Sequence, residues 1–332
     1  MRRALWRLSR SRLWTGVALS LVTTACSTAS PAASPAPSAQ SAFAEFSAEN
    51  PSDLTVGPDG AIWFTEHGPN YLGRIGADGH TRLFQTPAVS DKRSGIATGP
   101  DGNLWFCEFN GGKIGRLTPT GVFTMFPLPV PAAVTTLTRG PDGNLWFGES
   151  ETNRIGRITP AGVITEHLIP TAASDPRYVT LGPDGALWFA ENAGNRIGRM
   201  SAEGRATEFL LPSAGSGPTG IAVGGDGNLW FTEQTGNRIG RITTNGVVTE
   251  FPVPTTASGP YAIAAAPDGT LWFTEFDVAA NRVGHVSLQG RISEFPVPTP
   301  RSNPAGIIVA PDGAVWFAEN SGGHIARLKP TG

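Results

Sequence analysis

A unit of about 42 residues recurs seven times after residue 43, and this repetition narrows the folds that the chain can adopt. Each copy carries a phrase close to PDGxLWFTE, whose Trp falls at positions 63, 105, 146, 188, 230, 272 and 316. The spacings are 42, 41, 42, 42, 42 and 44 residues. The phrases NRIGRIT and TEFPVP, with small changes, follow the Trp in most copies. Repeats of this length indicate a closed ring or an array of small supersecondary units.

Within one copy, short apolar runs alternate with turn residues. The fifth copy contains the turn phrases GDG and NG, in which Gly and Asn readily adopt positive φ. Pro252 and Pro254 follow the last run. The runs between these signals predict four strands, at Ile221–Val223, Leu229–Glu233, Asn237–Ile242 and Val247–Phe251.

Four antiparallel strands per copy predict an all-β fold, a seven-bladed β-propeller over residues 43–332. Apolar residues stand on both faces of the strands, which is expected when neighbouring blades cover both faces of each sheet. Phe43–Phe46 reads as a fourth strand without its first three, and the seventh copy stops where its fourth strand is due. We therefore expect the N-terminal strand to close the last blade, which removes two exposed sheet edges.

The first 26 residues have the pattern of an export signal. Five Arg and no acid stand in residues 1–12, and an apolar run of 13 residues precedes Cys26. Thr24-Ala25-Cys26 resembles the end of a bacterial lipobox, although Thr23 stands where Leu is usual. Two interpretations stay open: lipidation of Cys26, which would place the protein on the outer face of the cell membrane or in the periplasm, or ordinary cleavage and secretion.

Residues 27–42, STASPAASPAPSAQSA, lack large apolar side chains and predict a Pro/Ala/Ser linker. Without residues 1–26 the chain has 20 Lys and Arg against 27 Asp and Glu, a net charge of about −7. No basic cluster remains, so nucleic acid is not an expected partner, and a membrane is expected only through an N-terminal lipid. Cys107 is then the one remaining Cys, so the domain is expected to have no internal disulfide. We also expect the protein to be a monomer.

Features present in every copy are expected to be structural. A Glu stands three residues after each Trp, and seven like charges facing one channel would repel one another. In most copies a donor side chain follows five residues later, which places it opposite the Glu across a hairpin. We expect pairing rather than a metal-binding carboxylate ring at Glu66, Glu108, Glu149, Glu191, Glu233, Glu275 and Glu319.

Function is expected where the copies differ, at one mouth of the central channel. The first variable position lies two residues before the apolar residue of the first strand and reads Ser52, Ser94, Thr135, Arg177, Thr219, Tyr261 and Ala305. The second lies four residues after each Trp and reads His67, Phe109, Ser150, Asn192, Gln234, Phe276 and Asn320. Both positions are predicted to lie on the same face of the ring.

The candidate ligand-binding residues are the chemically distinctive members of this mouth and its neighbours. They are His67, Arg177, Tyr178, Tyr261 and Asp277. His67 is the best candidate for proton transfer, because a histidine titrates near neutral pH, but it also fits a solvated loop position. The sequence has no pair of His at metal-ligand spacing, no G-x-S-x-G and no phosphate-binding loop.

The phrases PDGxLWFTE, NRIGRIT and TEFPVP resemble the streptogramin B lyase (virginiamycin B lyase) family over residues 43–332. The resemblance implies a seven-bladed propeller that opens cyclic depsipeptide antibiotics by elimination and confers resistance to them. In that family a His base removes a Cα proton and Mg²⁺ polarises the ester.

The positions that match the lyase site carry other residues here. The family's His at the start of blade six is matched by Tyr261, and its Glu-Pro-His-Gly in blade seven is matched by Asn303-Pro304-Ala305-Gly306. A further Glu of the family's site is matched here by Asn320, and a Tyr of that site is matched by Ser52. We therefore predict no catalytic residues, no metal ligands and no cofactor. The expected function is binding of a small molecule, peptide or cell-envelope ligand. The alternatives are the Mg-dependent lyase reaction and another propeller activity such as that of a lactonase.

Overall fold

The part of the chain that the structure describes is all-β, as predicted. The computed structural model describes residues 42–68, 71–87 and 93–330, which form 28 strands and no helix. The predicted export signal at 1–26 with Cys26, and residues 27–41 of the linker, lie outside these ranges. Over the described ranges, no helix with the length and apolar character needed to cross a membrane is found.

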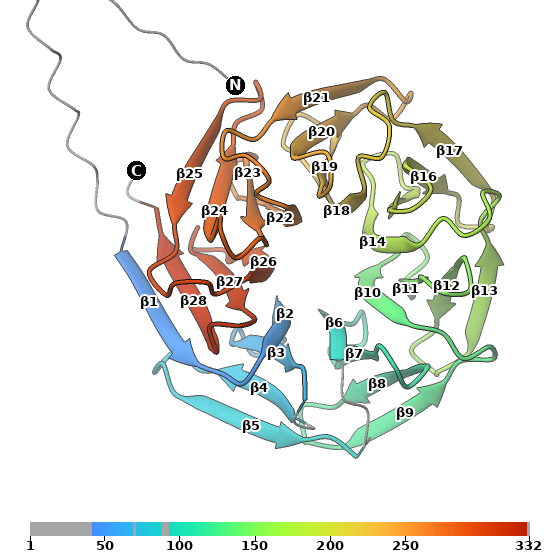
Figure 1. Ribbon diagram of the computed structural model, residues 1–332. Helices are drawn as coiled ribbons and strands as arrows, with labels where there is room; N and C mark the ends of the chain where they lie inside the picture. Colours follow the sequence, from blue (N-terminus) through green and yellow to red (C-terminus); the bar gives the residue numbers. More distant parts are fainter. Residues whose placement is uncertain (1–41, 69–70, 88–92, 331–332) are drawn as a thin grey trace, which may run out of the picture. The chain divides into compact units, whose positions relative to one another are not determined.

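The strands form seven four-stranded antiparallel sheets arranged as blades around a centre (Figure 1). Blade one contains β2 (Pro51–Val56), β3 (Ile62–Glu66), β4 (Tyr71–Ile75) and β5 (Thr81–Gln85). Blade two contains β6 (Arg93–Thr98), β7 (Leu104–Glu108), β8 (Lys113–Leu117) and β9 (Phe123–Pro127). Blade three contains β10 (Val134–Arg139), β11 (Leu145–Glu149), β12 (Arg154–Ile158) and β13 (Ile164–Leu168). Blade four contains β14 (Pro176–Leu181), β15 (Leu187–Glu191), β16 (Arg196–Met200) and β17 (Ala206–Leu210).

Blade five contains β18 (Pro218–Val223), β19 (Leu229–Glu233), β20 (Arg238–Ile242) and β21 (Val248–Pro252). Blade six contains β22 (Pro260–Ala265), β23 (Leu271–Glu275), β24 (Arg282–Val286) and β25 (Ile292–Pro296). Blade seven contains β26 (Pro304–Val309), β27 (Val315–Glu319), β28 (His324–Lys329) and β1 (Ala42–Ser47). The first strand of every blade faces the centre of the ring (Figure 1).

The N-terminal strand closes the last blade, as predicted. All six residues of β1 pair antiparallel with β28, from Ala42 opposite Lys329 to Ser47 opposite His324. The ring of Phe46 stacks on Trp316 with centroids 5.3 Å apart, and Phe43 meets the edge of Phe317 at 6.4 Å. The start and the end of the described chain therefore share one sheet, and Figure 1 shows β1 beside β28.

The innermost strands are longer than expected. In blade five β18 begins at Pro218, whereas the sequence predicted a start at Ile221, and its pairing with β19 shifts between these two residues. The same shift occurs in all seven blades. An irregularity of this kind bends a strand and redirects its side chains. Periodicity did not reveal these extra residues, and they are the ones that reach the mouth of the channel.

Large aromatic residues fill the interfaces between blades. Trp188 of blade four and Phe231 of blade five are fully buried in one cluster, and a Trp and a Phe from adjacent blades meet in each of the other six interfaces. The recurring Gly of the third strand makes room for the Phe. A Cβ added at Gly240 would lie 2.1 Å from the ring of Phe231. The repeated phrases thus encode a repeated packing interface.

The turn Asp of the PDG phrase holds the Trp in place. Asp226 accepts hydrogen bonds from the Trp230 indole at 3.1 Å and from the backbone and side-chain nitrogens of Asn228. Burial favours the neutral acid, but the hydrogen bonds from Asn228 and Trp230 lower the pKa of Asp226 overall.

Replacing Asp226 with alanine should therefore lower the free energy of unfolding by about 1–3 kcal/mol, because the buried indole loses its acceptor. Urea denaturation measures this change. Glu203→Ala, at an exposed turn, is the control and should stay close to the wild type. Equal midpoints for the two variants would contradict the role assigned to the Asp226–Trp230 bond.

The repeated glutamates are structural, but their charge state differs from the expected ion pairs. Glu149, Glu191, Glu233, Glu275 and Glu319 are fully buried. Burial, together with the charge of a second glutamate on the fourth strand, raises their pKa to about 7 or about 8. These side chains are therefore largely protonated in mildly acidic solution.

The predicted donors stand opposite these glutamates, yet most contacts differ from a simple pair. Arg196 pairs in register with Glu191, but its guanidinium lies 3.7 Å from Glu208 on β17. A cross-hairpin contact forms between Arg238 and Glu233, at 3.9 Å. In each of these blades, one Arg faces two glutamates, one on the second strand and one on the fourth. A single cation does not keep both carboxylates ionised.

Candidate functional site

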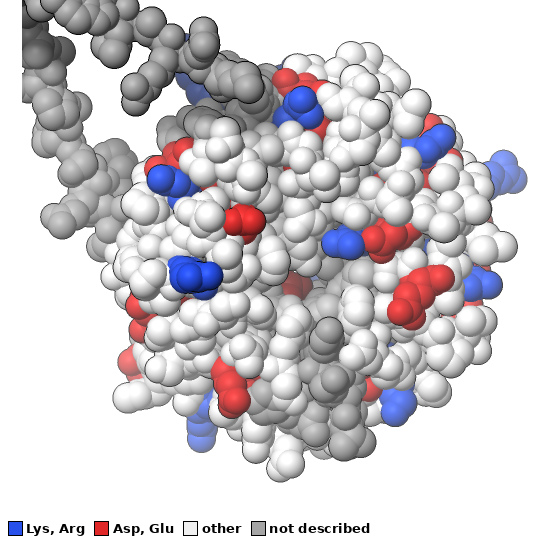
Figure 2. All heavy atoms as spheres, viewed as in Figure 1, with Lys and Arg blue, Asp and Glu red and all other residues white. Residues whose placement is uncertain are grey.

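A cavity of about 270 Å³ opens at the centre of one face of the ring, in the hollow that Figure 2 shows. It is lined by six of the seven variable first-strand positions and five of the seven variable loop positions. The lining residues are Ser52, Asp53, His67, Ser94, Gly95, Phe109, Thr135, Thr136, Ser150, Asp175, Arg177, Tyr178, Tyr261, Phe276, Ala305 and Asn320. The differences between blades thus meet in one place, as the sequence predicted.

Side-chain hydrogen bonds close the junction between blades four and five at Asn192 and Thr219. Asn192 donates through its side-chain nitrogen to Pro218 O and to Thr219 Oγ1, both at 3.1 Å. The Thr219 hydroxyl also lies 3.5 Å from Gln234 Oε1, and Thr219 is fully buried. Asn192 therefore fastens blade four to blade five, Thr219 and Gln234 contact each other within blade five, and none of the three lines the cavity.

Asp53, Thr136 and Tyr178 separate the cavity from a second opening on the other face. These three residues line both spaces. The second opening is otherwise largely aliphatic, with residues such as Leu54 and Ile96 from the first strands. The first space thus carries acidic, basic and aromatic side chains, whereas aliphatic residues and threonines make up most of the lining of the second.

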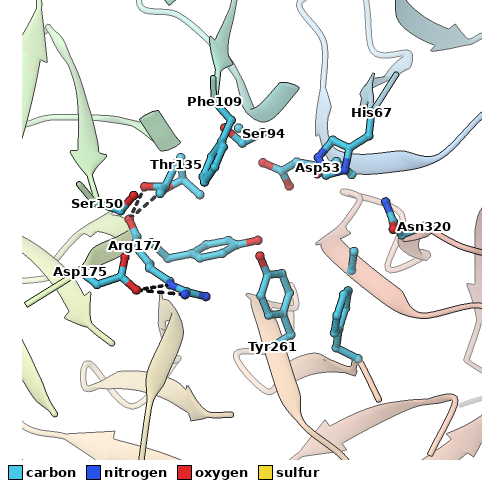
Figure 3. Close-up of a pocket in the computed structure, with 16 residues that line it drawn as sticks. Asp53, His67, Ser94, Phe109, Thr135, Ser150, Asp175, Arg177, Tyr261 and Asn320 are labelled. Carbon is cyan, nitrogen blue, oxygen red and sulfur yellow. Dashed lines mark hydrogen bonds and ion pairs between the residues drawn. The ribbon is translucent and has the colours of Figure 1, made fainter. Parts of the chain in front are cut away.

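Asp53 is the functional candidate that the sequence analysis missed. Its carboxylate points into the cavity (Figure 3) and accepts a hydrogen bond from the Ile96 amide at 3.3 Å and another from the Leu54 amide. Burial raises the pKa of Asp53 to about 7, and the two amides offset only part of this effect. A carboxyl with such a pKa in a cavity is a candidate for binding or proton transfer.

The signal for Asp53 was present one position further along the first strand. That position reads Asp53, Gly95, Thr136, Tyr178, Gly220, Ala262 and Gly306, so blade one alone carries a charge there. The variable position identified in the sequence is the residue before Asp53, which is Ser52 in blade one. With the bulge in the first strands, two successive residues of blades one to four reach the cavity, where a regular strand would present only one.

Three aromatic rings form one wall of the cavity. Tyr178 and Tyr261 meet edge to face at 5.9 Å, and Tyr261 lies 5.1 Å from Phe276. The two phenols share a hydrogen bond, and burial raises the pKa of both. They are neutral at physiological pH and offer one polar edge on an otherwise apolar surface.

Arg177 is fixed by a neighbour two residues away. Its guanidinium contacts the Asp175 carboxylate through Nε and Nη2, both at 3.0 Å (Figure 3). Its backbone carbonyl accepts from the Thr135 hydroxyl at 2.9 Å. Arg177 is therefore in the cavity, as predicted, with its charge balanced by Asp175, which the sequence analysis had not singled out.

The remaining predicted residues fall in different places. His67 lines the cavity at the mouth (Figure 3), whereas Asp277 is exposed, accepts from the Ala279 amide at 2.8 Å and does not belong to the lining. Cys107 is fully buried, as expected of a small thiol in a core, and burial raises its pKa strongly. Of these three side chains, His67 lines the cavity, and Asp277 and Cys107 lie outside it.

The positions that match the family's metal and base residues do not fit a magnesium ion. Asn303 and Asn320 donate through their side-chain nitrogens to Phe276 O at 2.8 Å and Pro51 O at 3.0 Å, fastening blades six, seven and one. Tyr261 is a neutral phenol, and Ala305 is a buried methyl group. Within residues 42–68, 71–87 and 93–330, no group of three or more His, Cys, Asp or Glu side chains is placed to hold a metal ion together.

Comparison with known proteins gives matches over almost the whole propeller. The model of the virginiamycin B lyase family matches residues 40–328. A virginiamycin B lyase from Staphylococcus aureus is 39% identical, covers 88% of this chain and 100% of its own, and superposes with a TM-score of 0.83. A streptogramin B lyase is 37% identical, with 87% and 97% covered and a TM-score of 0.83.

A catalytically inactive histidine-to-alanine variant of the S. aureus virginiamycin B lyase, solved with quinupristin, is 40% identical. It covers 88% of this chain and 100% of its own, with a TM-score of 0.82. No curated protein sequence matches the chain. The repeat phrases, the ring closed by β1 and the match over residues 40–328 agree, and the chain belongs to the virginiamycin B lyase family.

Proposed function

We propose that the central cavity binds a ligand and that the chain does not carry out the family's elimination reaction. The observation that carries this proposal is Ala305, a buried residue in the cavity wall at the position where the family has its base. A methyl group cannot accept a proton, and an elimination needs an acceptor for the Cα proton. The rest of the cavity is built as a binding site, with aromatic walls and fixed polar groups.

A relative supports the separation of binding from catalysis. The inactive histidine-to-alanine variant of the S. aureus enzyme was solved with quinupristin, so a family propeller without activity still holds this ligand. The chain described here carries alanine at the family's base position without any engineering. We therefore propose that its ligand is a compound of similar character, a cyclic peptide or depsipeptide with aromatic side chains that stack on Tyr261 and Phe276.

Quinupristin binding tests the proposal. Calorimetric titration of residues 40–332 should show saturable binding, and prolonged incubation with and without Mg²⁺ should return intact quinupristin in mass spectrometry and chromatography. Tyr261→Ala should weaken binding by about tenfold, because a buried aromatic contact of about 1.4 kcal/mol is lost. Tyr71→Ala, on β4 and outside the cavity lining, is the matched control.

Two results would overturn the proposal in different ways. Ring opening without a change of mass would restore the lyase reaction, and ring opening with the mass of one added water would indicate hydrolysis, as in a lactonase. Binding that Tyr261→Ala does not alter would place the ligand outside the cavity.

A further inference from the structure

We propose that Asp53 and the rings of Tyr178, Tyr261 and Phe276 form a subsite for an organic ammonium cation at the bottom of the cavity. The inference deepens the proposed function, on which it rests for the use of the cavity, by naming the chemical class of the group that enters deepest. The argument depends on the charge of the cavity, on its aromatic wall and on the surroundings of Asp53.

The cavity carries an excess negative charge when Asp53 is ionised. Its lining contains two carboxylates, Asp53 and Asp175, and one guanidinium, Arg177. Arg177 contacts Asp175 at 3.0 Å through two nitrogens, so one acid and one base balance each other. Figure 2 shows acidic surface within the central hollow. Asp53 is thus the charge that a ligand would have to neutralise.

Neutral groups donate the hydrogen bonds to the Asp53 carboxylate. Its hydrogen bonds come from the amides of Leu54 and Ile96, and its Oδ1 packs against Gly306, where an added Cβ would lie 2.6 Å away. The pKa of about 7 shows that these contacts do not offset burial. A cationic ligand would supply the missing charge and shift Asp53 to its ionised form.

The other titratable and charged groups around Asp53 do not take that role. Burial raises the pKa of Tyr178 and Tyr261 on the opposite wall and of Cys107 in the adjacent blade, and the charge of Asp53 raises these pKa values further. All three groups therefore stay neutral. At the second opening, Arg139 donates to Thr98 O at 2.8 Å and Gly99 O at 2.7 Å. His67 comes from the same blade as Asp53 and also lines the cavity (Figure 3).

The aromatic wall suits a cation with methyl groups. Tyr178, Tyr261 and Phe276 form a continuous surface, with centroid separations of 5.9 and 5.1 Å. Aromatic faces attract a desolvated ammonium, and several faces beside one carboxylate are the chemistry that recognises quaternary ammonium groups. A carboxylate ligand would meet repulsion from Asp53 and find Arg177 already paired.

Choline and its neutral isostere 3,3-dimethyl-1-butanol test the subsite, because they share a shape and differ in charge. Calorimetry with residues 40–332 should show that choline binds at least about tenfold more tightly than the isostere at pH 8. Choline does not titrate, so its affinity should rise about tenfold between pH 5.5 and pH 8 as Asp53 ionises. Below pH 7, binding should release a proton, which titration in buffers of different ionisation enthalpy detects.

Asp53→Asn keeps the shape of the side chain and should reduce choline affinity about tenfold and remove the pH dependence. Asp312→Asn makes the same charge change at an exposed turn and should leave both unchanged. Thermal unfolding shows whether each variant is folded, and the pH profile of the wild-type protein needs no variant. Equal affinities for choline and the isostere, or a flat pH profile, would overturn the subsite.

The two proposals fail separately. Binding of choline as described, with no binding of quinupristin, would retain the ammonium subsite and remove the peptide ligand. Binding of quinupristin at Tyr261, with choline no tighter than its isostere, would retain the proposed function and remove the subsite.

Discussion

Replacing both Phe43 and Phe46 with alanine is expected to lower the free energy of unfolding by about 5 kcal/mol and the melting temperature by roughly 10 °C. Both rings are partly buried on the closing strand and pack against Trp316 and Phe317 of the last blade. Their loss loosens β1, and a detached β1 would leave β28 as an open sheet edge. The effect should therefore exceed that of an equal number of side-chain atoms removed elsewhere.

The control is a pair of exposed apolar residues on fourth strands, Leu168 and Leu210, replaced with alanine. Their exposed fractions are 66% and 64%, so they contribute little to the core. Differential scanning calorimetry compares the two double variants. The closing role of β1 would be refuted if both variants melted at the same temperature, and increased aggregation of the Phe43/Phe46 variant alone would support the open edge.

A fall in stability between pH 5 and pH 8.5 is the second large effect that we expect. Glu149, Glu191, Glu233, Glu275 and Glu319 have folded-state pKa values raised to about 7 or about 8, from an ordinary value near 4.5. The folded state thus binds protons more tightly than the unfolded chain. The stability that these groups contribute is fully present below pH 4.5 and is lost as the pH rises through 7 to 8.

The magnitude follows from the number of sites. Each pKa unit by which a group differs between the folded and unfolded states changes the free energy of unfolding by about 1.4 kcal/mol, so five raised carboxyls together make a large effect. The carboxyls of the turn aspartates affect the stability at lower pH than the buried glutamates do. Hydrogen bonds lower the pKa of Asp59, for example, so its contribution is lost only as the pH falls below its ordinary value of 3.8. We therefore expect a maximum of stability near pH 5.

Melting temperatures at half-unit pH intervals measure this profile. Changing Glu191, Glu233 and Glu275 together to glutamine should flatten it and raise the melting temperature at pH 8.5, because glutamine keeps the shape and removes the ionisation. Glu203→Gln, at an exposed position, is the control. A melting temperature that stays level or rises from pH 5 to pH 8.5 would contradict the assignment.

The fold followed from the sequence because each copy repeats the same packing. The Trp and Phe of the LWF phrase alternate between the two faces of a strand, and both are buried, as a sheet covered on both sides requires. The isolated fourth strand at Phe43–Phe46 predicted the ring closure. The first strands began too late in the prediction because a bulge interrupts the alternation on which the prediction depended.

The candidate site was predictable in location and only partly in chemistry. Comparing blades identified the mouth, and Arg177, Tyr178, Tyr261 and His67 all line the cavity. Asp53 was missed because the bulge brings a second residue of the first strand to the cavity in blade one, as in blades two to four, which a regular strand would not do. Asp277 was included because of its loop, although a local turn directs its carboxylate to the Ala279 amide.

The charge states were the least predictable part. One sequence phrase places Glu and Arg opposite each other, which suggests an ion pair, but a second glutamate from the fourth strand and full burial reverse the expected ionisation. Such a result depends on three-dimensional crowding of like charges, and no single repeat phrase contains it.

The locked contacts of Asn192 and Thr219 have a consequence for the orientation of any guest. Because no residue of blade five lines the cavity, a molecule entering this near-symmetric ring finds its contacts on the other six blades. The orientation of the molecule about the ring axis is thereby restricted before any attractive contact forms. Substituting a few residues of a single blade should therefore change this orientation while leaving the other six blades intact.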